Sequence, residues 1–370
     1  KKISYLELSS IFLTILITFN CGINLYILKN DVGVNSWISL IIAYIIGLIP
    51  LLLILYIANY QPQLNILEKN KHLFGDIIGN IINYLLSIIL FIIAITILYN
   101  IVGFITTQFL YRTPIIISST LLVLLAVYCS IKEINVISHI SIILIFMNII
   151  MFILSNLSLI NNMKLDNLLP ILKISSSSIF LSSIKIAIIN ILPIITILII
   201  PKDKIINKEK YNKSLIITYI LGAFISLITT LGTISTLGIY LTKSFEYSEY
   251  MVLKKIKLFG FLERIENIVS MSWITESYIY LTIIIYTLSK NIPKKNENTF
   301  KYVNIIIGIL LILSTKYIFI NITAFNNYVE NLFIKITSIL FIIYVIIIIK
   351  IFINNIYVKS KIDNLHIKNK

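Results

Sequence analysis

Charged side chains are scarce in this chain: only 13% of its 370 residues are Asp, Glu, Lys or Arg. Apolar residues account for 58%, and the mean hydropathy is +0.96. This balance excludes an ordinary soluble domain, in which about 25% of the residues are charged. Most apolar runs reach about 20 residues, the length that a helix needs to cross a hydrocarbon core of about 30 Å. The sequence therefore predicts an all-α integral membrane protein with several spans.

Histidine and cysteine are scarcer still, with three and two residues. The sequence has no HExxH, Walker-type or GxSxG motif and no Cys/His spacing typical of a metal site. We therefore expect no enzymatic activity, no metal site and no cofactor. Cys21 and Cys129 both lie in apolar runs, so we expect no structural disulfide.

Acidic residues are half as frequent as basic ones, 16 against 31, and the formal net charge is +15. The basic residues lie in connections between apolar runs, and this distribution excludes a nucleic-acid-binding domain. Two explanations of the lysine excess stay open. One is attraction to an anionic lipid surface, and the other is a bias of composition, since Ile, Asn and Lys are abundant throughout. The partner that this composition predicts is the lipid bilayer.

Apolar runs bounded by charges or turn residues predict ten spans. We place them at residues 9–28, 36–57, 81–108, 114–130, 135–159, 179–201, 214–241, 264–289, 302–321 and 333–353. Ten spans divide as five plus five, and an odd number of spans in each repeat means that the two repeats are inverted.

The domain organisation follows from this division. We expect a single polytopic membrane domain over residues 1–370, with a first repeat at about 9–160 and a second at about 179–321, completed by a C-terminal helix and cytoplasmic tail at about 333–370.

The distribution of basic residues predicts the orientation of the spans. The connections and termini on the side of the N-terminus hold 19 Lys, whereas the opposite side holds nine Lys and Arg. Since basic residues concentrate on the cytoplasmic side, we expect both termini to be cytoplasmic. One long external connection, about residues 242–264, has apolar residues at helical spacing over 251–259. It predicts a short amphipathic helix, either a lid over a site or a helix that rests on lipid headgroups.

Two spans are interrupted at matching places in the two halves. The interrupting residues are Asn20, Cys21, Gly22 and Asn24 in the first span, and Asn190 and Pro193 in the sixth. A lipid-exposed helix cannot leave backbone groups unpaired, so such breaks occur where the freed groups line a protein cavity. Broken helices in equivalent repeat positions indicate a substrate site near the bilayer midplane. We therefore predict a ligand site at these two breaks.

Glu276 is the acid that the sequence places deepest in the bundle, about 12 residues or about 18 Å inside the eighth span. Ionisable residues at membrane depth are costly and are functional candidates by default. Two interpretations stay open: a ligand-binding or proton-coupling group that faces the cavity, and a protonated carboxyl that stabilises packing. His139 lies early in the fifth span, where we expect a backbone carbonyl to be its partner.

Short motifs occur in a characteristic order along the chain. They are Gly22-Ile23, Trp37-Ile38-Ser39, Phe74-Gly75 with Gly79, Thr113-Pro114, Asn167-Leu-Leu-Pro170-Ile-Leu172, Phe261-Leu-Glu-Arg-Ile-Glu-Asn267 and Trp273. Together they resemble, nearly end to end, the B subunits of spore germinant receptors, which are spore germination permeases of the amino acid/polyamine/organocation transporter superfamily. The sequence departs from that family at Asn190, where a carboxylate is common, and at His139, where a basic residue is common.

The resemblance implies the fold of that transporter superfamily, with broken helices 1 and 6. It also implies a nutrient-sensing subunit of the inner spore membrane that acts with a larger A subunit and a lipoprotein C subunit. We predict a receptor subunit that binds a small nutrient, an amino acid, in a midplane cavity and signals germination. The alternatives are a secondary active amino-acid transporter, for which Ser272, Thr275 and Ser277 are candidate ion ligands, and an assembly scaffold without a ligand.

Overall fold

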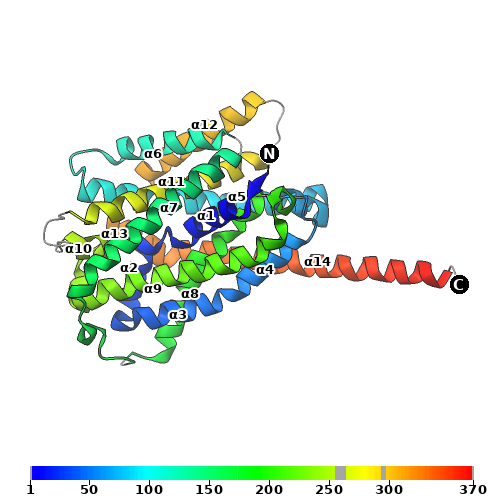
Figure 1. The fold of residues 1–370 in the computed structure, drawn as a ribbon. Coiled ribbons are helices and arrows are strands. Elements are labelled where there is room, and N and C mark those ends of the chain that lie inside the picture. Colours follow the sequence, from blue (N-terminus) through cyan, green and yellow to red (C-terminus); the bar gives the residue numbers. More distant parts are fainter. Residues whose placement is uncertain (1, 133, 173, 255–263, 293–296, 369–370) are drawn as a thin grey trace.

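The computed structural model describes residues 2–132, 134–172, 174–254, 264–292 and 297–368, most of which are helical (Figure 1). The α-helices are α1 (Tyr5–Ile17), α2 (Leu25–Asp31), α3 (Ser36–Ile46), α4 (Leu48–Asn59), α5 (Ile66–Gln108), α6 (Ile115–Ser130), α7 (Ile134–Leu159), α8 (Ser176–Ile191), α9 (Tyr211–Ser244), α10 (Ser248–Lys254), α11 (Glu266–Asn291), α12 (Glu297–Tyr317), α13 (Ile322–Tyr328) and α14 (Ile334–Lys368). Two short strands, β1 (Ile3–Ser4) and β2 (Ile205–Ile206), pair in parallel.

Eight helical segments of the described chain are long and apolar enough to cross a membrane. They are Tyr5–Asp31, Gly33–Asn59, Ile66–Gln108, Ile134–Asn162, Ser176–Ile199, Lys208–Ser244, Asn298–Tyr317 and Ile322–Ile356. The other two predicted spans fall on α6, which has only 16 residues, and on α11, which is rich in Ser, Thr and Tyr. α11 packs against α1, α5, α6, α7 and α12, so protein surrounds its polar side chains.

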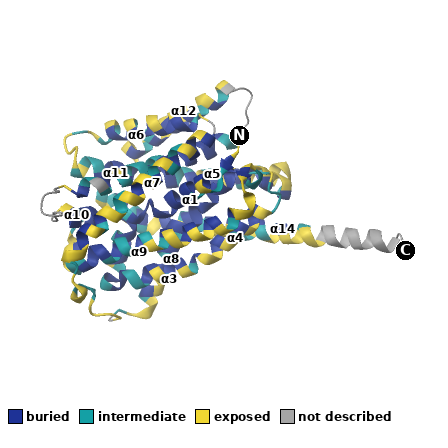
Figure 2. Cartoon of the chain, in the orientation of Figure 1, coloured by how far each residue is buried: buried dark blue, intermediate teal, exposed yellow. Residues whose placement is uncertain are grey.

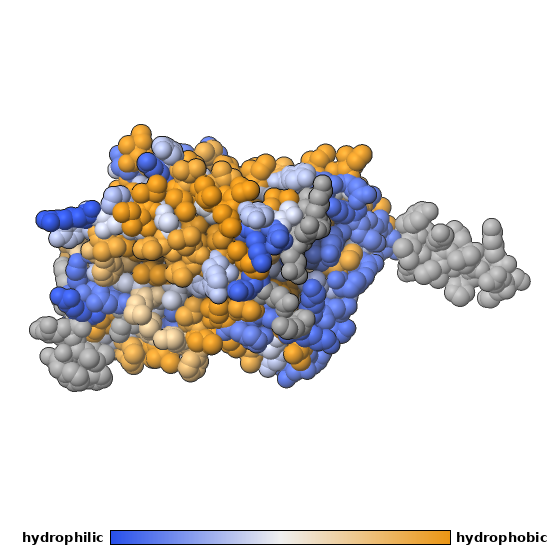
Figure 3. Space-filling model, turned by 90° about the horizontal axis from the view of Figure 1, so that it is seen from above, coloured by the Kyte–Doolittle hydropathy of each residue, from blue (hydrophilic) through white to orange (hydrophobic). Residues whose placement is uncertain are grey.

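Apolar side chains cover the outside of the bundle as well as its interior. Exposed large residues occur on several helices, among them Ile45, Leu121, Phe146 and Phe224. Buried residues gather on the inner faces of the helices (Figure 2), and apolar residues cover the middle of the face seen in Figure 3. Hydrophilic residues gather toward the ends of that face, most densely where α14 leaves the bundle. This surface fits a hydrocarbon core, and the protein is a multi-pass helical membrane protein.

The first predicted interruption is present. α1 ends at Ile17, α2 begins at Leu25, and a π turn, η1 (Asn20–Asn24), lies between them. Within this turn Cys21 has an extended backbone with ψ 128°, and Gly22 has φ +82°. A φ in this left-handed region favours glycine, which has no Cβ to clash with the backbone.

The sixth predicted span changes its helical geometry at the predicted position. α8 ends at Ile191, and a 3-10 helix, η5 (Leu192–Ile199), continues the segment. Pro193 lies in the first turn of η5, where its missing N–H removes a donor from the helical ladder.

The last span begins earlier than the sequence predicts. Residues 322–332 were expected to connect two spans, but they form α13 and a π turn, η8 (Val329–Phe333), that continue into α14. The cause is a cap: Asn321 Oδ1 accepts a hydrogen bond from the Ala324 N–H at 2.8 Å. The N-terminus and the outgoing part of α14 lie at the same end of the bundle, opposite the end that holds α10 (Figure 1).

Candidate functional site

A cavity of about 80 Å³ lies beside the break in the first span. This volume equals about five to eight water positions, enough for a small organic molecule. Its wall comes from α1 and η1 (Leu13, Ile17, Asn20, Cys21), α7 (Ile145, Asn148, Ile149, Phe152, Ser155, Asn156, Leu159), α9 (Ile225, Thr229, Thr233), α10 (Glu249, Val252, Leu253) and α11 (Val269, Ser272, Trp273, Glu276). The wall is largely apolar, with two carboxyl groups and a few amides and hydroxyls. Such a wall suits a ligand with an apolar body and a polar end.

Glu276 belongs to a polar cluster formed by α7 and α11. Asn148 Nδ2 donates to Glu276 Oε1 at 3.4 Å and to the Ser272 carbonyl at 3.3 Å. The Thr275 hydroxyl donates to Asn148 Oδ1 at 3.0 Å, which orients the amide. The cluster holds the half-buried Glu276 carboxyl on the cavity wall, where it can accept a hydrogen bond from a ligand ammonium group.

Glu249 brings the second carboxyl to the cavity from α10. Its side chain is 4% exposed, and its Oε1 accepts a hydrogen bond from the Gly22 N–H at 3.4 Å. Burial raises the pKa of the Glu249 carboxyl, and the Lys29 ammonium group, the Gly22 N–H and the Ser248 hydroxyl oppose part of that rise. Lys29 is itself buried and donates to the backbone carbonyl of Phe245, just before α10. The start of α10 is thereby fixed to α2.

The break around Gly22 is closely packed. Asn100 Nδ2 of α5 donates to the Cys21 carbonyl at 3.1 Å, so a carbonyl freed by the break has a protein partner. A Cβ on Gly22 would lie 2.7 Å from Asn100 Oδ1 and 3.1 Å from the Trp273 ring. Glycine is therefore required here both by the backbone dihedral and by the space available.

Asn20 connects the cavity wall to α9 and α3. Its Oδ1 accepts from Asn24 Nδ2 and from the Ser226 hydroxyl, both at 2.9 Å. The Ser226 hydroxyl also forms a hydrogen bond of 2.7 Å with the Tyr44 hydroxyl. These bonds hold the Asn20 side chain in one orientation, because its acceptor oxygen is used twice.

The structure brings together four of the predicted site residues. Asn20 and Glu276 line the cavity, and Gly22 and Asn24 lie in the same break directly beside it. Gly22 contacts the cavity residue Trp273, and Asn24 orients Asn20.

The other two predicted residues, Asn190 and Pro193, lie at the second break and are not among the residues that line the cavity. Asn190 is 1% exposed and lies next to the Tyr44 hydroxyl, but within the described chain neither of its amide atoms makes a hydrogen bond of good geometry. The Leu192 carbonyl beside it accepts a hydrogen bond from the Tyr344 hydroxyl of α14. The second break is therefore packed against the last span.

Sequence reasoning missed several polar residues of the wall, among them Asn148 and Glu249. Asn148 has no local signal, because asparagine is common throughout the chain. Glu249 lies in the long external connection, where the helix predicted over 251–259 begins earlier, at Ser248, and is present over its described residues 251–254. α10 covers Ser248–Lys254, it lines the cavity with Val252 and Leu253, and residues 255–263 lie outside the described residues.

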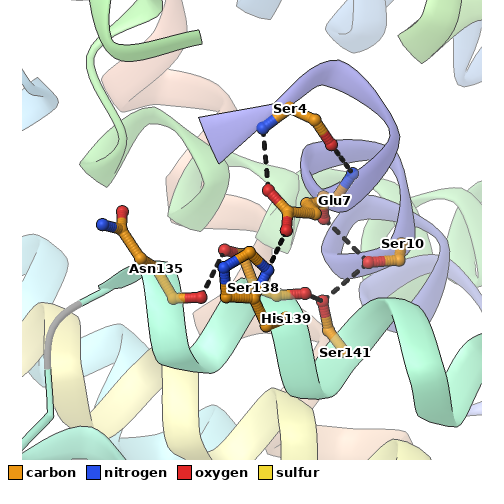
Figure 4. Close-up of polar contacts among 7 residues, drawn as sticks. All are labelled: Ser4, Glu7, Ser10, Asn135, Ser138, His139 and Ser141. Carbon is orange, nitrogen blue, oxygen red and sulfur yellow. Dashed lines mark hydrogen bonds and ion pairs between the residues drawn. The ribbon is translucent and has the colours of Figure 1, made fainter. Parts of the chain in front are cut away.

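His139 has a partner that the sequence did not predict. Figure 4 shows its ring directed from α7 toward Glu7 of α1, and His139 Nδ1 contacts Glu7 Oε1. Glu7 is 6% exposed and also accepts from the Ser4 N–H at 2.7 Å. The hydroxyls of Ser10 and Ser141 form a second link of 2.6 Å. The expected backbone partner for His139 is wrong, because α1 and α7 pack side by side and place an acid next to the ring.

A multi-pass helical bundle with a small, partly polar cavity beside a broken helix is the architecture of a permease or a membrane receptor. The family model described as spore germination protein matches residues 5–323 of this chain. The chain therefore belongs to the spore germination protein family. All of the residues that line the cavity lie within the matched segment. A comparison with curated proteins gave no match.

Proposed function

We propose that this protein is the membrane subunit of a germinant receptor and that it binds a small nutrient, an amino acid, in the cavity beside η1. The observation that carries the proposal is the composition of the wall, where the Glu276 carboxyl faces an otherwise largely apolar cavity next to a break in α-helical structure. Membership of the spore germination protein family supports it. Binding shifts the conformation of the helices around the cavity, and A and C subunits in the inner spore membrane receive that shift.

In this proposal the ligand is recognised at both polar ends. Its ammonium group donates a hydrogen bond to the Glu276 carboxyl, its carboxylate accepts from the Gly22 N–H, and its side chain packs on the apolar wall. Asn20 and Asn24 shape the polar end of the cavity. Asn190 and Pro193 take part through the second break, where a buried amide without a hydrogen bond of good geometry gains one if η5 moves or a ligand group reaches it.

The proposed architecture is ten spans in a five-plus-five inverted repeat. Both termini are cytoplasmic, and helices 1 and 6 are broken near the bilayer midplane. Each predicted span overlaps a helical segment, including α6 and α11. The N-terminus and the outgoing part of α14 share one end of the bundle, as an even number of crossings requires (Figure 1). The excess of lysine on that side supports its placement in the cytoplasm.

A secondary active amino-acid transporter is the second candidate. The observation in its favour is the Ser277 hydroxyl of α11, which is buried and has no hydrogen-bond partner within the described chain. Ser277 offers an oxygen atom to a coupling ion, as an ion-driven carrier needs. The other two candidates, Ser272 and Thr275, lie on a different side of the same helix and offer a separate position.

The test uses the full chain in lipid nanodiscs and in proteoliposomes, with an equimolar mixture of radiolabelled L-alanine, L-valine, L-leucine and L-isoleucine as the probe. We expect saturable binding to the wild-type chain and none to Gly22→Leu, which places a side chain against Asn100 and Trp273. Gly75→Leu is the control, because Gly75 also has a positive φ of +78° but nothing lies within 4 Å of its Cβ position. Binding without uptake supports the receptor, and ion-dependent uptake supports the transporter. Equal binding to both variants and the wild type would place the site elsewhere.

A further inference from the structure

Glu249 and a ligand carboxylate need the same hydrogen-bond donor. The Glu249 carboxyl reaches the cavity from α10 and accepts from the Gly22 N–H at 3.4 Å. The Ser248 hydroxyl donates to its other oxygen at 3.4 Å. A main-chain N–H that the break leaves free is therefore already used by a carboxyl of the same chain.

The cavity offers few other donors to an anion. Among the described residues that line it, none is Lys, Arg or His. The Asn148 amide donates to Glu276 and to a backbone carbonyl, so both of its N–H bonds already have acceptors. The wall residue Asn20 keeps its amide Nδ2 as a donor, since both of its hydrogen bonds use Oδ1. The Trp273 indole N–H is buried and has no partner within the described chain. Two carboxylates cannot share this end of a cavity with low dielectric constant, because like charges at short range repel strongly.

We propose, on the basis of the function proposed above, that Glu249 is a tethered competitor for the carboxylate of the amino-acid ligand at the Gly22 N–H. A ligand must carry a carboxylate to displace it, so an amine that has the same apolar body but no carboxylate does not. The Asn20 amide N–H group on the cavity wall then serves as a second donor to the incoming carboxylate. Glu249 thereby sets both the affinity of the site and its selectivity for amino acids over amines.

Displacement of Glu249 acts directly on α10. This helix has seven residues, and it packs against η1, α7, α9 and α11. The segment before it is anchored at two points, by Lys29 to the Phe245 carbonyl and by Asn326 of α13 to the Glu246 carboxyl at 2.9 Å. Loss of the bond to Gly22 therefore releases α10 from the break in the first span while its start stays fixed.

The experiment measures binding of the four-amino-acid mixture to the full chain in nanodiscs for the wild type, Glu249→Gln and Glu249→Ala. A hydrogen bond of ordinary strength that must be broken before binding lowers the apparent affinity by about threefold to tenfold. We expect Glu249→Ala to lower the half-saturating concentration by that factor and Glu249→Gln, which keeps a neutral acceptor, to lower it by less. Glu246→Gln is the matched control, since it removes a carboxyl from the same connection outside the cavity wall and should leave binding unchanged.

A second measurement follows hydrogen exchange of residues 248–254 in the wild-type chain. We expect faster exchange with the amino-acid mixture and no change with ethylamine, isobutylamine, isoamylamine and 2-methylbutylamine, which lack the carboxylate. Weaker binding in both Glu249 variants would overturn the proposal, because it would make Glu249 a direct ligand contact. Unchanged binding in both would overturn it as well. If the wild type binds and Gly22→Leu does not, weaker or unchanged binding in the Glu249 variants rejects only the role of Glu249 as a competitor. The proposed function of the cavity then still stands.

Discussion

Gly22→Ala is the substitution for which the structure gives the most definite expectation. Gly22 has φ +82° and ψ −35°, a sparsely populated conformation that costs an L-residue about 1–3 kcal/mol. The added methyl group would lie 2.7 Å from Asn100 Oδ1 and 3.1 Å from the Trp273 ring. Asn100 must move to relieve this clash, and it then loses its hydrogen bond to the Cys21 carbonyl.

The expected magnitude combines these two effects. Loss of the Asn100 hydrogen bond costs about 0.5–1.5 kcal/mol, so the free energy of unfolding should fall by about 1.5–4.5 kcal/mol in total. Gly75→Ala is the comparison without a packing clash, because Gly75 has φ +78° and ψ 173° and nothing lies within 4 Å of its Cβ position. Its free energy of unfolding should fall by about 1–3 kcal/mol, from the dihedral alone.

The assay is unfolding of the full chain in mixed micelles by titration with sodium dodecyl sulfate, followed by tryptophan fluorescence. Both variants should also be assayed for binding, where Gly22→Ala should be weaker because Trp273 lines the cavity and Gly75→Ala should match the wild type. Unchanged stability and unchanged binding in Gly22→Ala would refute the packing argument, since they would mean that Asn100 and Trp273 do not confine residue 22.

Three further predictions concern single polar groups. Glu276→Gln keeps the size of the side chain but removes its charge, so binding of the amino-acid mixture should weaken at least about tenfold at unchanged protein abundance; equal affinity would assign Glu276 to packing. Asn190→Leu removes a buried amide without a hydrogen bond of good geometry, so unfolding in detergent should cost about 1 kcal/mol more while binding weakens; unchanged binding would remove Asn190 from the site. A double-mutant cycle of Glu7→Gln and His139→Ala should give a coupling below about 1 kcal/mol, because the His139 side chain is 67% exposed.

The sequence predicts those parts of the site that stand out against an apolar background. Asn20, Gly22 and Asn24 interrupt a long apolar run, and Glu276 is a charge within another, so simple patterns of polarity indicate them. Asn321 has the opposite effect, because the polar residues around it suggest a loop whereas its side chain caps α13.

Glu249 could not be predicted in the same way. It lies in a polar connection, where an acid is ordinary, and only the tertiary packing of α10 against η1 and α11 brings it to the cavity. The pairing of His139 with Glu7 likewise depends on two helices that are distant in the sequence. Sequence patterns report burial and helix breaks, whereas partners across the bundle follow from packing that no local pattern encodes.

The native cysteines allow the most direct test of ligand binding in the cavity. Cys21 lies on the cavity wall and is partly exposed, whereas Cys129 is buried in α6 away from it, so Cys129→Ser leaves one thiol at the site. The measurement is the rate at which methyl methanethiosulfonate modifies Cys21 in nanodiscs, with and without the four-amino-acid mixture. At about 90% occupancy the rate should fall about tenfold, because the bound amino acid covers the thiol. An unchanged rate at a concentration that saturates binding would contradict the assignment of this cavity as the ligand site.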